Sequence, residues 1–365
     1  MKKLKFMVVL ILIFAGCTGQ IEEDSRALTL MTWNIHNLFD GEDDGFEYNE
    51  FRQSAGWSGE KYLGRINSIS AAIGILEYPP DIIVFQEIES LKILEDLASS
   101  MPGFLWGHFA GNYGSAVGLG ILSRFPLVDA RAHSIAIEGD VIPRPVLELR
   151  VLAPELPAVA LDEDPVQSSF VIFACHWKSK IGGDAATEKL RRASAQVILR
   201  RIRELWDAEP ELGIIITGDL NENYDEFFRQ GMTMICALMP DGDYTEDSAD
   251  NFFEDLSRQT DFIVISADKP PAPRYFPQET IVFFSPWFDD LEKGSYYYRG
   301  NWETIDHFLV SGQFFNNDGW QYETTAVMNI SPFANSNGIP ISYNQRTGAG
   351  LSDHLPLMLR LINLR

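Results

Sequence analysis

The feature that most constrains the fold of this chain is a series of short apolar runs separated by amphipathic stretches. Nine runs have the length and composition of β-strands: residues 28–34, 82–86, 117–122, 146–152, 170–175, 213–217, 261–265, 304–310 and 355–361. Two longer stretches, residues 61–77 and 187–206, space their apolar side chains as helices that cover a sheet. Because no segment repeats at a fixed period, the pattern predicts one layered domain.

Four segments that interrupt this pattern are acidic or rich in Gly, Asn, Pro and Ser. They are residues 41–59, 154–167, 240–255 and 331–350. None is long enough to form a separate domain, so we expect all four to be loop-like insertions.

The first 16 residues have the order of a bacterial export signal. Lys2, Lys3 and Lys5 precede the apolar run 6–14, which is too short to span a bilayer comfortably. Ala15-Gly16-Cys17 then resembles a lipobox, at which Cys17 would be acylated. We therefore expect a signal peptide over 1–16, a lipidated cysteine with a polar tether over 17–27, and an exported cell-envelope lipoprotein anchored to a bacterial membrane. An ordinary signal peptide with a coincidental cysteine is the alternative.

Charge and cysteine content limit the possible partners. Removal of the three lysines of the leader lowers the formal charge from −23 to −26, a field that repels any phosphate polymer. This charge excludes a protein that binds nucleic acid mainly by long-range attraction. After processing, only Cys175 and Cys236 remain, either as one bridge or as two buried thiols.

Polar side chains gather where the predicted strands end. Six patches follow or end an apolar run: Thr32-Trp33-Asn34, Gln86-Glu87, His176-Trp177-Lys178-Ser179, Gly218-Asp219-Leu220-Asn221, Ile305-Asp306-His307 and Ser352-Asp353-His354-Leu355-Pro356. A solvated loop could explain any one patch. Carboxylates, amides and imidazoles at six strand ends instead indicate a ligand site at one edge of the sheets.

The order of these patches resembles that of the endonuclease/exonuclease/phosphatase, or DNase I-like, superfamily. The match runs from about Leu28 to Leu361 and includes the segment Gly120-Ile-Leu-Ser-Arg-Phe-Pro126. The resemblance implies that residues 28–365 form one domain of this superfamily. Its fold is an α/β, four-layer α/β/β/α sandwich, in which two packed, mostly antiparallel sheets are flanked by helices.

The chemistry of phosphodiester hydrolysis suggests which residues hold a metal ion. The reaction needs a hard cation, and Mg²⁺ prefers a few carboxylates together with water. Glu87 is the best ligand on these grounds, with Asn34 nearby, and Asp353 would complete the metal or water network. The sequence has neither clustered cysteines nor a zinc-type His-Glu-x-x-His pattern, which favours Mg²⁺, with Mn²⁺ or Ca²⁺ as possible replacements.

The resemblance also assigns catalytic roles. Asp219 would orient or activate the attacking water, and Asn221 would bind the phosphoryl group; on an extended segment their side chains would share one side. His354, oriented by Asp306, would contact the phosphate or carry a proton. His176 matches a histidine of the nuclease and sphingomyelinase branches.

Basic side chains and one further histidine lie outside this catalytic set. Lys178 and Arg144 are expected to bind substrate locally. Lys189, Arg191 and Arg192 form a basic helix face that we interpret as a solvated surface. His307 receives no role.

The most specific function that the sequence indicates is that of a nuclease-like phosphodiesterase. Its segment Cys-His-Trp-Lys-Ser-Lys resembles the His-x-Lys-Ser-Lys patch of secreted bacterial nucleases. The expected substrate is a phosphodiester, most simply nucleic acid bound locally, and no partner protein is implied. A sphingomyelinase-like lipid phosphodiesterase and a non-catalytic surface binding protein on the same scaffold are the alternatives.

Overall fold

A computed structural model of the protein describes residues 27–112, 114–137, 140–141, 144–154, 167–242 and 261–364. The predicted signal peptide, the lipidation site Cys17 and nearly all of the tether lie outside these residues. So do positions 155–166 and 243–260, which make up most of two predicted insertions. No helix in the described ranges is long and apolar enough to cross a membrane.

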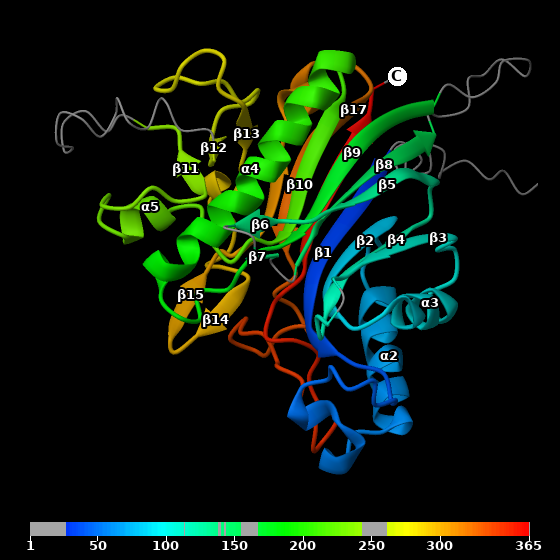
Figure 1. The fold of residues 1–365 in the computed structure, drawn as a ribbon. Helices are drawn as coiled ribbons and strands as arrows, with labels where there is room; N and C mark the ends of the chain where they lie inside the picture. The colour runs from blue at the N-terminus through cyan, green and yellow to red at the C-terminus, as the bar shows by residue number, and fades with distance from the viewer. Residues whose placement is uncertain are drawn as a thin grey trace, which may run out of the picture.

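The described chain forms two sheets that stack face to face (Figure 1). The first has six strands in the order β17 (Trp320–Val327), β18 (Leu357–Asn363), β1 (Ala27–Leu38), β2 (Ile82–Ile88), β4 (Gly118–Ser123) and β3 (Trp106–Ala110). The second has eight, in the order β11 (Leu238–Pro240), β12 (Ile263–Ser266), β13 (Val282–Phe284), β16 (Asp306–Val310), β10 (Gly213–Asp219), β9 (Gln167–His176), β8 (Val146–Pro154) and β5 (Leu127–His133).

Both sheets are mixed but mostly antiparallel. Four of the five pairings in the first sheet are antiparallel, as are four of the seven in the second. The parallel pairs β1–β2 and β9–β10 lie in different sheets. Two short hairpins stand apart from the sheets: β14 (Tyr296–Tyr298) with β15 (Asn301–Glu303), and β6 (Ala136–Ile137) with β7 (Asp140–Val141).

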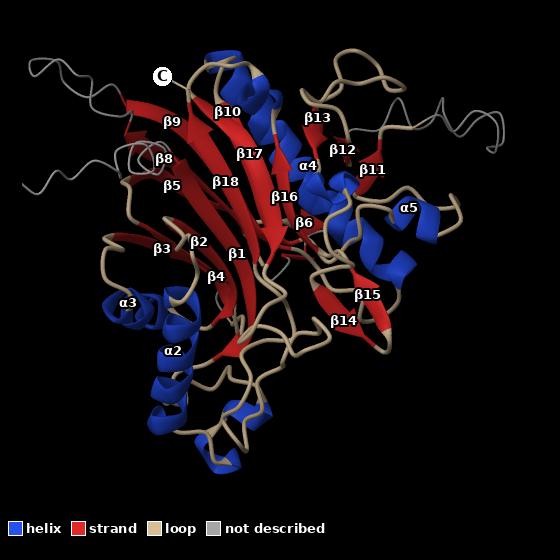
Figure 2. Cartoon of the chain, turned by 180° about the vertical axis from the view of Figure 1, so that it is seen from behind, coloured by secondary structure: helices blue, strands red, loops and turns tan. Residues whose placement is uncertain are grey.

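Helices cover the outer faces of the two sheets (Figure 2). Helices α2 (Gly59–Gly74) and α3 (Leu91–Ser100) pack against the six-stranded sheet, and α4 (Asp184–Ala208) packs against the eight-stranded sheet. The remaining helix, α5 (Glu226–Arg229), is a single turn. Strand β1 is therefore buried on both faces over most of its length, including its Thr and Asn side chains. The four-layer sandwich is confirmed.

All nine predicted strands and both helices are present, with shifted ends. Helix α2 stops at Gly74, short of the predicted 77, and Pro79 and Pro80 follow in the segment before β2. Cys175 and Cys236 are buried free thiols, so the alternative of a bridge between them is wrong. The geometry of the site then depends on which strand ends lie together.

Candidate active site

Strand register brings the predicted residues of the second sheet together. Asp219, the last residue of β10, lies opposite His176 on β9 and Asp306 on β16. Gly218 makes this close approach possible. Its φ is +133°, and a Cβ there would lie 2.0 Å from the carbonyl oxygen of Cys175. The glycine of the Gly-Asp-Leu-Asn patch is therefore required by packing between β9 and β10.

The amide of Asn34 joins the two sheets at this edge. Its Nδ2 donates to Glu87 Oε1 at 3.2 Å and to Asp219 Oδ2 at 3.0 Å. Its Oδ1 accepts the backbone N–H of His36 at 3.0 Å. Asn34 is buried, so this one side chain fixes the spacing of two carboxylates that come from different sheets.

Backbone strain is concentrated beside the same carboxylates. Glu87 has φ +64°, and the consecutive residues His36 and Asn37 have φ +53° and +57°. Left-handed backbone is unfavourable for L-residues other than glycine, and it persists where the surroundings enforce it. Here the Asn37 N–H donates to Glu87 Oε2 at 2.9 Å, so the strained turn presents a donor to the predicted metal ligand.

His354 and Asp306 form the predicted pair. The Nδ1–H of His354 donates to Asp306 Oδ2 at 2.8 Å, and the hydroxyl of Ser295 donates to the same oxygen at 2.6 Å. Burial opposes the charge of the imidazole, but the Asp306 carboxylate outweighs it and raises the pKa of His354 to about 10. The ring of Tyr296 stacks on the imidazole with centroids 4.5 Å apart. His354 is thus an oriented imidazolium whose Nε2 remains for a ligand.

His176 has the opposite charge state. Burial and the nearby Arg144 cation hold its pKa well below the usual range, so the ring is neutral. Its Nε2 lies 2.7 Å from Arg144 Nη1, 3.5 Å from Asp219 Oδ2 and 3.7 Å from Glu87 Oε1. The structure therefore brings together His176, Arg144 and the two carboxylates.

Asn221 lies beside Asp219 for a different reason from the one expected. The segment is not extended there, because β10 ends at Asp219 and Asn221 has φ +51°. The Asn221 N–H donates to Asp219 Oδ1 at 2.9 Å, and its Nδ2 donates to the carbonyl of Trp177 at 3.1 Å. The prediction that an extended segment places the side chains of Asp219 and Asn221 on one side was wrong. A tight turn places the Asn221 amide instead.

Two predicted residues lie at the margin of this cluster. Asp353 faces His36, with Oδ1 and Nδ1 3.6 Å apart, and its side chain is 27% exposed. The ammonium of Lys178 bonds within its own loop, to Ser179 Oγ at 3.3 Å and the Ile181 carbonyl at 3.5 Å. Asp353 is therefore close enough to join the cluster. The ammonium of Lys178 instead bonds within its own loop and not to the other predicted site residues.

The donor set fits a hard divalent cation. Glu87, Asp219, Asp306 and Asp353 offer carboxylate oxygens, and those of Asp219 and Asp306 lie within 4.8 Å of a His354 nitrogen. Burial, with Asp306 adding repulsion, raises the pKa of Asp219 to about 7. Negative charge is thus only partly compensated by the protein, and oxygen ligands of this kind suit Mg²⁺ better than Zn²⁺. The cluster could hold such an ion.

One expectation about surface charge is wrong. Arg191 is fully buried, not solvated, and bonds to Glu188 and Glu222. Lys189 is exposed, and Arg192 pairs with Asp261 at 2.7 Å. His307, which had no predicted role, is buried and its Nε2 donates to the Glu222 carbonyl at 2.7 Å. These contacts brace the turn that carries Asn221.

Three residues that contact the predicted site residues were not predicted from the sequence. Ser295, Tyr296 and His36 contact Asp306, His354 and Asp353 respectively. A run of three tyrosines at 296–298 is the only local signal for the second of these contacts. No pattern in the sequence indicated the other two.

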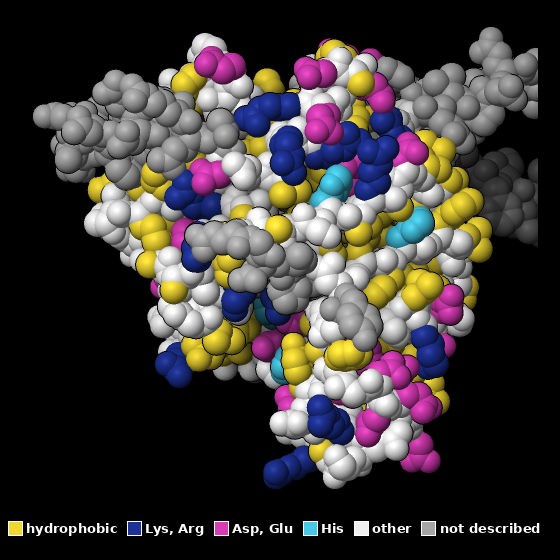
Figure 3. Space-filling view, viewed as in Figure 1, with side chains coloured by type: hydrophobic (Ala, Val, Ile, Leu, Met, Phe, Trp, Pro, Cys, Tyr) yellow, Lys and Arg dark blue, Asp and Glu magenta, His cyan; other side chains and the backbone are white. Residues whose placement is uncertain are grey.

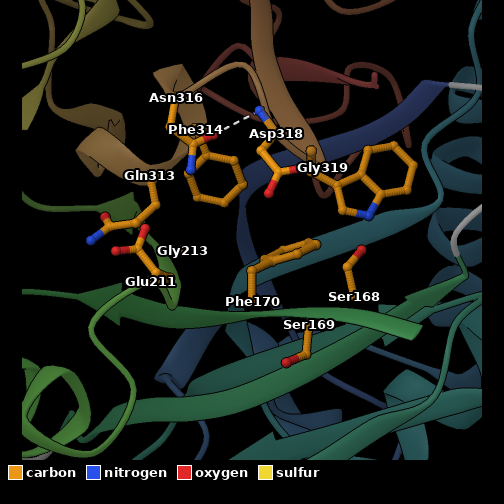
Figure 4. Close-up of a pocket in the computed structure, with 11 residues that line it drawn as sticks. Ser168, Ser169, Phe170, Glu211, Gly213, Gln313, Phe314, Asn316, Asp318 and Gly319 are labelled. Atoms are coloured by element: carbon orange, nitrogen blue, oxygen red, sulfur yellow. Dashed lines mark hydrogen bonds between the residues drawn. The ribbon is translucent and has the colours of Figure 1, made fainter. Parts of the chain in front are cut away.

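A cavity of about 260 Å³ lies at the other end of the sandwich (Figure 4). Phe170, Gly213 and Phe314 contribute to its wall. Phe170 precedes His176 by six strand residues, or roughly 20 Å at 3.3 Å each. None of the predicted site residues lines this cavity, so the chemistry belongs to the strand ends rather than to the cavity.

Buried carboxylates, an imidazolium and a neutral imidazole lie together at one edge of a two-sheet sandwich. The Endonuclease/Exonuclease/phosphatase family model matches residues 31–354. Because this match spans most of the chain, the protein belongs to the Endonuclease/Exonuclease/phosphatase family.

Several solved structures align with most of this chain, and the first of them supports the fold. Truncated TDP2 from Caenorhabditis elegans aligns with a TM-score of 0.50 and 14% identity, covering 92% of this chain and 97% of that chain. An endonuclease/exonuclease/phosphatase family protein from Bacteroides thetaiotaomicron gives 0.47 and 16%, covering 92% and 98%. A mannosyl-6-phosphatase from the same species gives 0.44 and 17%, covering 92% and 99%. No curated protein sequence matches the chain.

Proposed function

We propose that this protein is a divalent-metal-dependent phosphodiesterase of the nuclease-like type. The observation that carries the proposal is the Asn34 amide, which donates to Glu87 and Asp219 from two different sheets while His176 lies within 3.7 Å of both. A scaffold used only for binding would not need this convergence of acid, amide and imidazole.

Each residue has a role that follows from its charge state. Glu87, with Asn34 and Asp353, would hold the cation, which when bound neutralises phosphoryl oxygens and lowers the pKa of an attacking water. Asp219 would accept a proton from the attacking water, since its raised pKa suits a general base near neutral pH. His354, held as an imidazolium by Asp306, donates from Nε2 to a phosphoryl oxygen. Asn221, whose Nδ2 donates to the Trp177 carbonyl, would bind the same phosphoryl group.

A lipid phosphodiesterase is the second candidate because apolar side chains are exposed on both segments that flank the site. Ile181, in the loop after Lys178, is 82% exposed, and Tyr298, on the hairpin before Asp306, is 50% exposed. Such side chains suit contact with a lipid surface. Purified protein with Mg²⁺ should therefore be tested on DNA, RNA, sphingomyelin and inositol phosphates side by side. Choline-phosphate release without cleavage of nucleic acid would select the lipid alternative.

Replacement of Glu87 by glutamine is expected to lower hydrolysis at least about 100-fold, because the amide keeps the shape but loses the anionic ligand. EDTA should have the same effect on the wild-type protein. The matched control is Glu89→Gln, since Glu89 contacts the Asp40 N–H and no predicted site residue. Full activity in EDTA, or equal losses in both variants, would contradict the metal role.

The mixture of basic and acidic side chains on the described part of the α4 face offers no extended basic track. We therefore expect any nucleic acid to bind through a few contacts near the site. Basic and acidic side chains alternate there (Figure 3), and ion pairs join Arg150 to Glu209 and Arg201 to Glu148. We expect the association constant for DNA to fall gently with salt, with a logarithmic slope that corresponds to roughly two or three phosphate contacts. A slope of about eight contacts, measured by fluorescence titration, would reveal an extended basic track and contradict this prediction.

A further inference from the structure

The guanidinium of Arg65 is buried beneath the candidate site. Arg65 projects from α2, and its nitrogens donate to four backbone carbonyls. Nη1 bonds to Asn37 at 2.7 Å, and Nη2 bonds to His36 at 2.9 Å, to Leu351 at 3.3 Å and to Ile35. A single side chain therefore joins the left-handed turn within β1, where the pairing with β2 shifts register, to the loop before Ser352-Asp353-His354.

Fold stability alone does not account for a cation in this position. Arg65 is 2% exposed, and no ion pair joins it to a carboxylate of the described residues. Its only other partner there is the ring of Tyr343, 4.2 Å from the guanidinium carbon. Burial lowers the pKa of Arg65 to about 10. Buried charges are costly, and apolar side chains of similar volume often stabilise a core as well or better.

Three of the four carbonyls that Arg65 binds lie at the strained turn, on Ile35, His36 and Asn37. His36 and Asn37 are both left-handed, and their N–H groups donate to Asn34 Oδ1 and Glu87 Oε2. If the turn relaxed to ordinary backbone, both donors would leave the carboxylate cluster. The second loop is tied to the same place, because the Ser352 hydroxyl donates to the Asn34 carbonyl at 2.6 Å.

We propose that Arg65 is a positioning residue that holds the left-handed turn at His36 and Asn37, and so fixes Asn34 and Glu87 relative to the loop of Asp353 and His354. The guanidinium suits this task because its planar, forked donors can satisfy several carbonyls at once, whereas a lysine ammonium cannot reproduce that geometry. This inference rests on the proposed function only for its effect on hydrolysis. Its effect on the turn is independent of any reaction.

The test compares Arg65→Lys with wild type in two ways. Turnover of the best phosphodiester substrate should fall about 10- to 100-fold, as for groups that orient metal ligands, with KM changed less than about threefold. In metal-free protein, amide hydrogen exchange of peptides covering residues 33–40 and 349–355 should rise about tenfold or more. Arg65→Met should act in the same direction, and Arg65→Lys remains informative if the methionine variant does not fold.

Two controls sharpen the comparison. Arg124→Lys is matched, because Arg124 also donates to a backbone carbonyl, that of Pro80, at the other end of β2; it should change neither measurement. Asn37→Gly should restore part of the lost turnover in the Arg65→Lys background, since glycine adopts φ +57° without the usual penalty.

Several outcomes would overturn the proposal. They are wild-type exchange in the two peptides of Arg65→Lys, a rise spread evenly over the whole chain, and a failure of Asn37→Gly to restore any turnover. If the wild-type protein hydrolysed no phosphoester, the proposed function would fail, but the exchange measurement would still decide whether Arg65 holds the turn.

Discussion

Asp219→Asn is expected to lower kcat by about 1,000-fold while KM changes little. The asparagine keeps the size of the side chain and its place opposite His176 and Asp306, but it cannot accept the proton of an attacking water. Positioned general bases contribute roughly 100- to 10,000-fold, and a group that acts only in the transition state affects kcat rather than KM. Steady-state kinetics at saturating Mg²⁺ measures both constants.

The stability of metal-free Asp219→Asn provides a second measurement, and it should rise although kcat falls. Burial and Asp306 raise the pKa of Asp219 to about 7, above its ordinary value of 3.8. The folded state therefore binds this proton more tightly than the unfolded state, so stability is lost as pH rises from about 4 through about 7. Asp219→Asn removes that loss, and its melting temperature in EDTA should exceed that of wild type at pH 8 but not at pH 4.

The matched control is Asp225→Asn, six residues further along. Asp225 is partly exposed and pairs with Arg229 at 2.7 Å, so the variant should keep both activity and melting behaviour within a small margin. A merely structural Asp219 would lose activity and stability together. Loss of turnover with Mg²⁺ together with a lower melting temperature at pH 8 in EDTA would contradict its role as a base.

The ends of central strands were predictable from sequence because those strands are buried on both faces. β2, β9 and β10 are short apolar runs that end in polar groups, and pairing then brings Asp219, His176 and Asp306 to one edge. The strands β3, β5 and β17 were missed, since they lie at sheet edges and carry exposed or polar side chains: β5 reads Leu-Val-Asp-Ala-Arg-Ala-His. Period and composition do not mark such strands.

Residues that act through tertiary contacts were harder to predict. Tyr296 stacks on His354 across 58 positions of sequence, and no local pattern reports that contact. The left-handed turns at Asn37 and Asn221 also followed no glycine signal. Tertiary contacts, such as those with Arg65 and with the Trp177 carbonyl, hold the chain in these turns.

Arg191 was placed on the surface because it stands between Leu190 and Arg192 in a charged stretch. Its spacing from Ser194, Ile198 and Ile202 nevertheless puts it on the buried stripe of α4. Glu188, which pairs with Arg191, lies one turn earlier on the same helix and is therefore a local partner. Glu222 also pairs with Arg191, but only the fold shows that the two residues meet.

Arg191→Met is expected to lower the free energy of unfolding by about 3–5 kcal/mol, because removal of one partner leaves buried charge unpaired. Arg191 Nε lies 2.9 Å from Glu222 and 3.1 Å from Glu188, and both carboxylates are almost fully buried. Arg192→Met on the same helix is the matched control. Its ion pair with Asp261 is partly exposed, so its loss should stay below about 1 kcal/mol. Urea denaturation of the two variants measures the difference.

The pH dependence of that loss separates charge from packing. Burial and the neighbouring Glu188 already raise the pKa of Glu222 well above its usual range, and Arg191 is the cation that opposes this shift. Without Arg191, the folded state holds the Glu222 proton still more tightly, so the variant should lose stability further as pH rises and regain it in acid. A loss that stays the same from acid to alkaline pH would mean that Arg191 stabilises the protein only by filling space. A loss that is smaller in acid would show that the charge of Arg191, and not only its volume, stabilises the fold.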